Sequence, residues 1–271
     1  MACASCGADN GHFYDCPESR FARIETTNAP ALATPMEPAN ERNRLFAIPL
    51  ALVVMWLLVH TGIGGFITRL CFAMPLHELG HAVSSWFTGA YAVPLLWFTP
   101  MGEERMPSLV VAEVIALGLW SFYARKNEWL TWPPVTVAVL LGIGLLIPSH
   151  ARQALVTFAG DGGGLLFGAA LMASVFLPDD LRITRGGLRW GYLVIGAGAF
   201  ANIASEWFSA WRDSANINFG HIEGVGLSDP SKLVDVFGWS ERRLINSYLT
   251  LTVVCLIALA MLIIFKARQR E

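Results

Sequence analysis

The chain has 271 residues, of which 54% are hydrophobic and only 15% are charged, and its formal net charge is −2. Soluble domains carry about 25% charged residues, so this composition argues against a soluble protein. The lack of net positive charge argues against a nucleic-acid partner. The sequence therefore indicates an integral, multi-pass membrane protein that is embedded in a lipid bilayer.

The first 19 residues form a small polar head that is rich in cysteine and histidine. Three thiols and one imidazole are a chemically sound ligand set for a structural zinc ion: Cys3, Cys6, His12 and Cys16. A zinc site of reduced thiolates favours a cytoplasmic location for the head. The alternative is an unstructured terminus with incidental cysteines, because a single CxxC pair is a modest signal.

A linker and a transmembrane domain are expected to follow. Residues 20–43 hold three prolines among small and polar residues, so we expect a flexible linker there. The transmembrane domain is expected over residues 44–271. Its candidate spans are seven apolar segments: Leu45–Gly62, Phe66–Thr88, Ser108–Ala124, Pro133–Pro148, Leu155–Leu177, Gly187–Phe208 and Tyr248–Phe265. The fourth is short enough to be re-entrant, so we expect an all-α polytopic fold with about six to seven transmembrane helices.

A long polar stretch separates the last two candidate spans. It contains Asp229 followed by Pro230, a pair that favours the start of a helix, so a short surface helix is expected over Pro230–Phe237. Basic residues flank both ends of the transmembrane domain, and both ends would therefore prefer the cytoplasm. An odd number of spans cannot satisfy that preference at both ends.

The second candidate span contains the motif His77-Glu78-Leu79-Gly80-His81. Histidines four residues apart share one face of a helix, where they can occupy two corners of a zinc tetrahedron. Glu78 can then accept a proton from a water molecule at the metal and pass it to a leaving amine. HExxH occurs by chance in soluble proteins, but an ionisable residue at the centre of a bilayer costs about 2.5–3.5 kcal/mol and rarely persists without a partner. The motif therefore predicts a catalytic zinc site.

Zinc needs a third protein ligand, and Asp161 is the strongest candidate. Glycines flank it on both sides and allow helix backbones to approach closely. The helical rise places His77 and Asp161 about 15 Å from opposite membrane faces, and hence at similar depth. The alternative is a turn at the entrance of a span, where Asp-Gly is common. Glu206 is a rival ligand, a partner of a ligand histidine, or an interfacial residue beside Trp207 and Trp211.

The segment Phe72–Ala82 resembles the active-site helix of the site-2 protease family of intramembrane zinc metalloproteases. Asp161, with the two glycines that follow it, resembles the second signature of that family, in which the aspartate is the third zinc ligand. The resemblance implies that His77, His81 and Asp161 bind zinc and that Glu78 is the catalytic base. It implies a metalloendopeptidase that cleaves transmembrane segments of other membrane proteins.

Two features depart from that family. The Asn and Pro residues that usually precede its Asp-Gly pair are missing here, and no stretch is long enough for an inserted peptide-binding domain. The resemblance is therefore to a minimal or divergent member. Alternative functions are a non-catalytic zinc-binding sensor or adaptor, and a transporter, because buried His, Glu and Asp also line ion paths.

Overall fold

The computed structural model describes residues 38–125, 128–179, 181–222 and 226–269. The chain divides into two units, Met1–Glu41 and Arg42–Glu271, and the second unit contains the candidate site. The candidate structural zinc ligands of the head lie outside the described residues: Cys3, Cys6, His12 and Cys16. The first described helix begins at Pro38, so residues 38–43 of the predicted linker are helical. Proline is tolerated there because the first turn of a helix does not need its missing N–H group.

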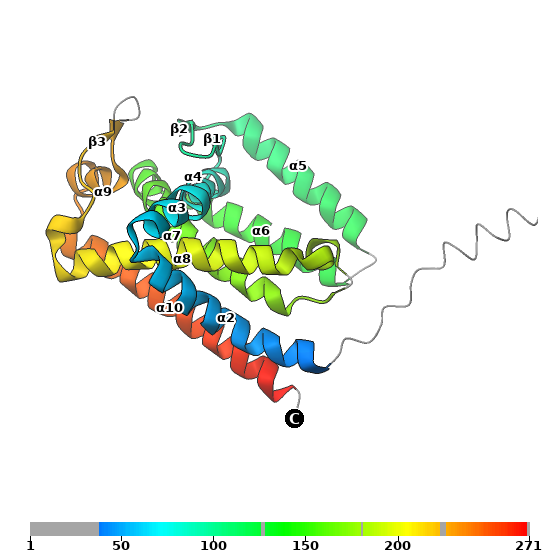
Figure 1. Ribbon diagram of the computed structural model, residues 1–271. Helices are drawn as coiled ribbons and strands as arrows, with labels where there is room; N and C mark the ends of the chain where they lie inside the picture. The colour runs from blue at the N-terminus through cyan, green and yellow to red at the C-terminus, as the bar shows by residue number, and fades with distance from the viewer. Residues whose placement is uncertain (1–37, 126–127, 180, 223–225, 270–271) are drawn as a thin grey trace, which may run out of the picture. The chain divides into compact units, whose positions relative to one another are not determined.

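Helices make up most of the described chain, and each of the seven predicted apolar segments is helical (Figure 1). The long helices are α2 (Pro38–Val59), α5 (Pro107–Ala124), α6 (Glu128–Leu146), α7 (Ser149–Ala173), α8 (Leu188–Arg212) and α10 (Glu241–Arg268). The second predicted segment is a composite of α3 (Gly62–Thr68), the π-helical turn η1 (Arg69–Ala73) and α4 (Met74–Phe87). Short helical turns join them: η2 (Ser174–Phe176), η3 (Arg182–Gly187), η4 (Ser214–Asn216), α9 (Asp229–Ser231) and η5 (Lys232–Val236).

Two small antiparallel hairpins correct the all-α prediction. Strand β1 (Ala90–Ala92) pairs with β2 (Met101–Arg105), and β3 (His221–Ile222) pairs with β4 (Gly226–Leu227). The β1–β2 hairpin connects α4 to α5. These strands are too short to leave a clear alternating pattern in the sequence, which is why the sequence did not reveal them.

Fewer helices than the sequence predicted meet both the length and the apolarity that a membrane span requires. Within the described ranges, three helices are long and apolar enough to cross a bilayer: α5, α7 together with η2, and α10. The segments Asn43–Val59 and Gly62–Phe87 pass only as a pair and bend by 119° at the break between them, which raises the number to at most four. Helix α6 contributes only the shorter apolar segment Trp132–Leu146. The predicted six to seven spans therefore exceed what helix length and composition support.

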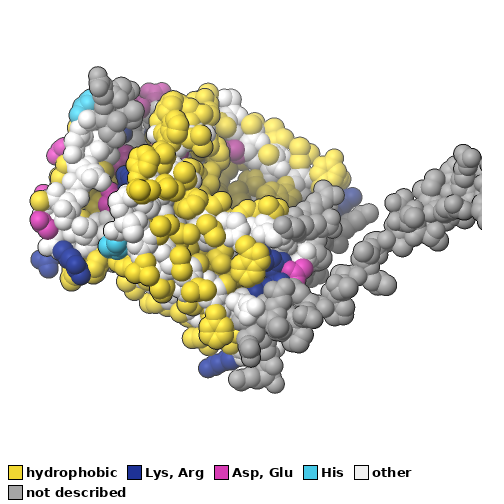
Figure 2. Space-filling view, in the orientation of Figure 1, with side chains coloured by type: hydrophobic (Ala, Val, Ile, Leu, Met, Phe, Trp, Pro, Cys, Tyr) yellow, Lys and Arg dark blue, Asp and Glu magenta, His cyan; other side chains and the backbone are white. Residues whose placement is uncertain are grey.

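The surface of the second unit suits a lipid environment. Large hydrophobic side chains are exposed on α2, α5, α6 and α10, for example Leu57 at 65%, Leu146 at 84% and Met261 at 60%. Figure 2 shows hydrophobic side chains over much of the visible face. Contiguous apolar surface of this kind is unfavourable in water and marks membrane contact or protein contact. In Figure 1, α10 ends at the same end of this unit at which its part of α2 begins.

The core is built around α7, which packs on α4 on one side and on α8 on another, while α8 also packs on the turn η1. Glycines bring α4 against α7: a Cβ atom on Gly80 would lie 1.9 Å from the carbonyl oxygen of Ala159, and one on Gly163 would lie 2.5 Å from the Cα of Gly80. No larger residue fits at such a contact without moving a helix. The close approach turns the histidine face of α4 toward Asp161 on α7, as the sequence predicted for the flanking glycines.

Candidate metal centre

Helix α4 presents the HExxH motif inside the core. His77 and His81 lie one turn apart, and His81 and Glu78 are buried. Pro75 lies at the start of α4, directly after the wider turn η1. The wider π-turn accommodates the loss of the backbone hydrogen bond that Pro75 cannot donate. The chain therefore continues as a helix into the motif.

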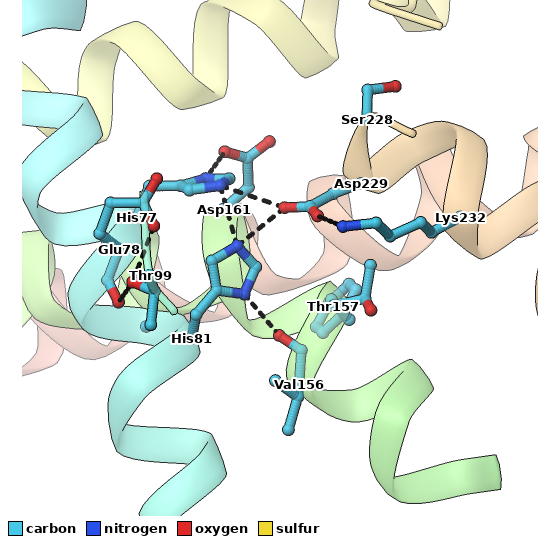
Figure 3. A network of polar contacts seen from close by, with 12 residues as sticks. His77, Glu78, His81, Thr99, Val156, Thr157, Asp161, Ser228, Asp229 and Lys232 are labelled. Carbon is cyan, nitrogen blue, oxygen red and sulfur yellow. Dashed lines mark hydrogen bonds and ion pairs between the residues drawn. The ribbon is translucent and has the colours of Figure 1, made fainter. Parts of the chain in front are cut away.

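Three ligand atoms converge on one point (Figure 3). The Nε2 atoms of His77 and His81 lie 3.1 Å apart, and Oδ2 of Asp229 lies 3.1 Å from the first and 2.9 Å from the second. A tetrahedral zinc ion with bonds of 2.0–2.1 Å needs neighbouring ligand atoms about 3.3 Å apart. The observed triangle is within a few tenths of an ångström of that spacing. Two imidazoles and one carboxylate are also a donor set that zinc accepts, so the residues fit the metal.

The outer nitrogen of each histidine is held by a hydrogen bond. Nδ1 of His81 donates to the carbonyl oxygen of Val156 at 2.8 Å, and Nδ1 of His77 donates to Oδ1 of Asp161 at 2.8 Å. Because both acceptors need the hydrogen on Nδ1, the lone pair of each Nε2 is left for a metal. This arrangement orients both rings before any ion binds.

The third corner of the triangle is occupied by Asp229, whereas the sequence analysis expected Asp161 there. One carboxylate oxygen of Asp161 accepts from His77 on the side of the ring away from the triangle, and the other accepts from Nε1 of Trp207 at 2.8 Å. Both oxygens are therefore engaged. Asp161 also lies within α7, so the alternative of a turn at a span entrance is wrong.

Asp229 comes from the polar segment between α8 and α10. The segment folds back over the site because Ile217 and Leu233 are buried in the core at either side of it. Asp229 opens the turn α9, and the hydroxyl of the preceding Ser228 caps that turn. Burial opposes the charge of Asp229, but the neighbouring imidazoles of His81 and His77 hold the pKa of its carboxyl well below its usual range. The carboxylate is thus ionised, as a metal ligand must be.

Glu78 lies outside the triangle of candidate ligand atoms. Its Oε2 accepts a hydrogen bond of 2.8 Å from the hydroxyl of Thr99, which lies in the loop between β1 and β2. Glu78 lines the same cavity as the triangle without occupying a corner of it. A carboxylate beside a metal position but outside its ligand set is suited to proton transfer.

A cavity of about 670 Å³ surrounds these groups and opens between three parts of the chain: α4, the β1–β2 loop and the segment 218–232. Its charged and polar lining includes Arg69, Lys232 and His221 besides the candidate ligands. Water can therefore reach a site that lies inside an otherwise apolar protein.

Glu206 lies in the wall of this cavity and outside the triangle. It pairs with Arg69 and accepts a hydrogen bond from Asn218. Neither contact reaches a ligand histidine, so the structure assigns Glu206 to the cavity wall instead of the rival-ligand and histidine-partner roles. The predicted short helix over Pro230–Phe237 is present as α9 and η5, although it delivers Asp229 to the site and is not merely a surface element.

Sequence reasoning did not single out Asp229 as a candidate ligand, because Asp-Pro is also an ordinary helix start. The usable signal was a polar stretch too long for a simple connection, since such segments are often functional. Comparison of the chain with protein-family models, curated proteins and solved structures finds no match. The likeness to the site-2 protease family therefore rests on the two motifs themselves.

Proposed function

We propose that this protein is a multi-pass membrane zinc endopeptidase that cleaves transmembrane segments of other membrane proteins. The observation that supports it is the triangle of His77 Nε2, His81 Nε2 and Asp229 Oδ2, with Glu78 beside it. Three protein ligands and one open position distinguish catalytic zinc sites from closed structural ones. Zinc held there would act as a Lewis acid that polarises a peptide carbonyl and increases the acidity of water.

The residues around the triangle have separate tasks in this proposal. Glu78 accepts the proton of the attacking water and passes it to the leaving amine. Thr99 holds the carboxylate of Glu78 by its hydrogen bond and so fixes the direction from which the proton is taken. Asp161 keeps the ring of His77 in one tautomer and one orientation.

The membrane setting decides the substrate class. An unbroken helix hides its backbone amides in internal hydrogen bonds, so a transmembrane substrate must unwind locally before attack. The polar cavity offers the unwound backbone hydrogen-bonding groups that lipid lacks. We propose six to seven membrane-crossing helices with the N-terminal head in the cytoplasm; an even number, six, would place the basic C-terminal tail on the same side.

The decisive experiment combines metal content with cleavage. The purified wild type is expected to carry one zinc ion at this site and to cut single-span proteins within the span. Glu78→Gln should keep the zinc and lose the cleavage. Glu104→Gln, the same change at an exposed glutamate of β2, should keep both.

Two outcomes would contradict the proposal. Cleavage that survives Glu78→Gln would exclude Glu78 as the base. A wild type that binds zinc but cuts no membrane protein would instead indicate the non-catalytic sensor or transporter.

A further inference from the structure

A second cavity, of about 450 Å³, lies between α4, α5 and α6, apart from the metal centre. Its lining is almost wholly apolar: Val83, Trp86, Leu109, Ala116, Val137 and Leu141 are among its residues. Glu113 of α5 is the one charged residue in the lining. We call this cavity the α5 groove. Its volume is typical of sites that bind a ligand.

One carboxyl oxygen of Glu113 has no hydrogen-bond partner among the described residues. Its Oε2 atom is buried, and no described residue forms a hydrogen bond with it. A buried carboxyl oxygen without a hydrogen bond costs free energy, and an ionisable residue within a membrane span is a candidate for function. The α5 groove therefore offers an acceptor that a donor from outside this chain could satisfy.

The depth of Glu113 limits what that donor can be. Helix α5 has 18 residues, so it is about 27 Å long and close to the thickness of the hydrocarbon core. Glu113 lies six residues after Pro107, which places it about 9 Å inside the core. Lipid headgroups remain outside the core. A donor at that depth is most readily supplied by a side chain of another transmembrane segment.

Space for such a segment exists beside α5. This helix packs on α6, and only 6% of its apolar window is buried within the chain. A Cβ atom built on Gly118 of α5 or on Gly142 of α6 meets nothing within 4 Å. Small residues with open space in front of them allow another helix to approach closely.

We infer that the α5 groove is a docking site for a transmembrane segment that carries a small polar residue, such as Asn or Ser, whose donor group binds Glu113. This inference rests on the proposed function, because it makes the segment part of the substrate. The groove contacts α4 around Val83–Phe87, which is about 9 Å along the helix from His77–His81.

Binding can be measured without cleavage. The Glu78→Gln protein is reconstituted in lipid nanodiscs with a fluorophore, and labelled single-span peptides are titrated by energy transfer. One peptide has an all-leucine core, one has Asn about 9 Å inside the core, and one has Asn at the centre. The Asn peptide of matching depth should bind about threefold more tightly than the all-leucine peptide, the size of a typical hydrogen bond between membrane helices.

Variants on α5 make the test specific. Glu113→Leu should abolish the threefold preference, whereas Ser121→Leu, which removes a polar group from the same helix outside the groove, should keep it. A photoreactive residue at position 116 should crosslink to the matching peptide. Equal binding of all peptides, a preference that survives Glu113→Leu, or crosslinks to lipid alone would each overturn the inference. This experiment measures peptide binding and not cleavage, so a negative result would not contradict the proposed protease activity. Loss of zinc or of cleavage in the tests of the proposed function would likewise not contradict the binding result.

Discussion

Replacement of the two aspartates at the metal centre should affect zinc binding unequally. Asp229 lies at a corner of the triangle, whereas Asp161 bonds the outer nitrogen of His77. The triangle edges of 2.9–3.1 Å suit the coordination of zinc by all three atoms together. Asp229→Ala thus removes a direct bond and a negative charge. Asp161→Asn removes no direct bond to the metal; it takes away the negative charge that strengthens the hydrogen bond orienting His77.

The two losses differ in size. Partners of metal-ligating histidines contribute about 10–100-fold in metal affinity, or about 1.4–2.7 kcal/mol, so Asp161→Asn should weaken zinc binding by that factor. Asp229→Ala should weaken it by more than about 100-fold, because a ligand is worth more than the group that supports one. Asp235→Asn, at an exposed carboxylate of the same segment, should leave the affinity unchanged.

The assay is zinc retention against chelators of graded affinity, with metal content measured by mass spectrometry on detergent-purified protein. Circular dichroism of each variant controls for folding. The result that refutes the reasoning is a reversed order: Asp161→Asn losing zinc completely while Asp229→Ala binds like the wild type. That order would restore Asp161 as the ligand.

Three further outcomes follow from the structure. Gly80→Ala should lower the unfolding temperature and zinc content, because its Cβ would overlap the backbone of α7, whereas Gly118→Ala faces open space and should change neither; thermal unfolding in detergent with metal analysis checks both. Zinc removal should increase hydrogen exchange in the segment 217–233, since the metal would tie this segment to α4; unchanged exchange measured by mass spectrometry would count against the tie. Thr99→Val should reduce turnover without reducing zinc content, by less than Glu78→Gln, because it removes only the hydrogen bond that orients the base; steady-state cleavage rates against zinc content decide.

The helical framework was predictable because apolarity and length are local properties of the sequence. All seven apolar segments are helices, and the motif face of α4 follows from a spacing of four residues. The number of spans was not predictable in the same way. Helix α8 is apolar enough to suggest a span, but it also carries the buried polar residues Arg189 and Asn202, which donate hydrogen bonds to Val175 and Thr68 within the protein.

The site was half predictable for a related reason. His77, Glu78 and His81 lie on one helix, so their relation is fixed by helical geometry. The relation of Asp161 to His77 depends on how α7 crosses α4, and the arrival of Asp229 depends on where a long polar segment folds back. Both depend on tertiary packing, which residue spacing along one helix does not reveal. Depth along a span placed Asp161 at the right height, but height alone cannot tell which nitrogen of an imidazole a carboxylate meets.

Polar groups inside this apolar protein fall into two kinds: those that form hydrogen bonds within the described chain, and those with a buried atom that forms none. At the metal centre each one has a partner: His81 has the carbonyl of Val156, Asp161 has His77, and Glu78 has Thr99. These contacts offset the cost of placing charge in a membrane, and they hold the groups in one geometry, as catalysis requires. The opposite holds for Glu113, whose buried oxygen meets no donor within the described chain. Completed hydrogen bonds at the candidate metal centre and an open carboxyl oxygen in the α5 groove are the contrast on which the proposed docking of a transmembrane segment rests.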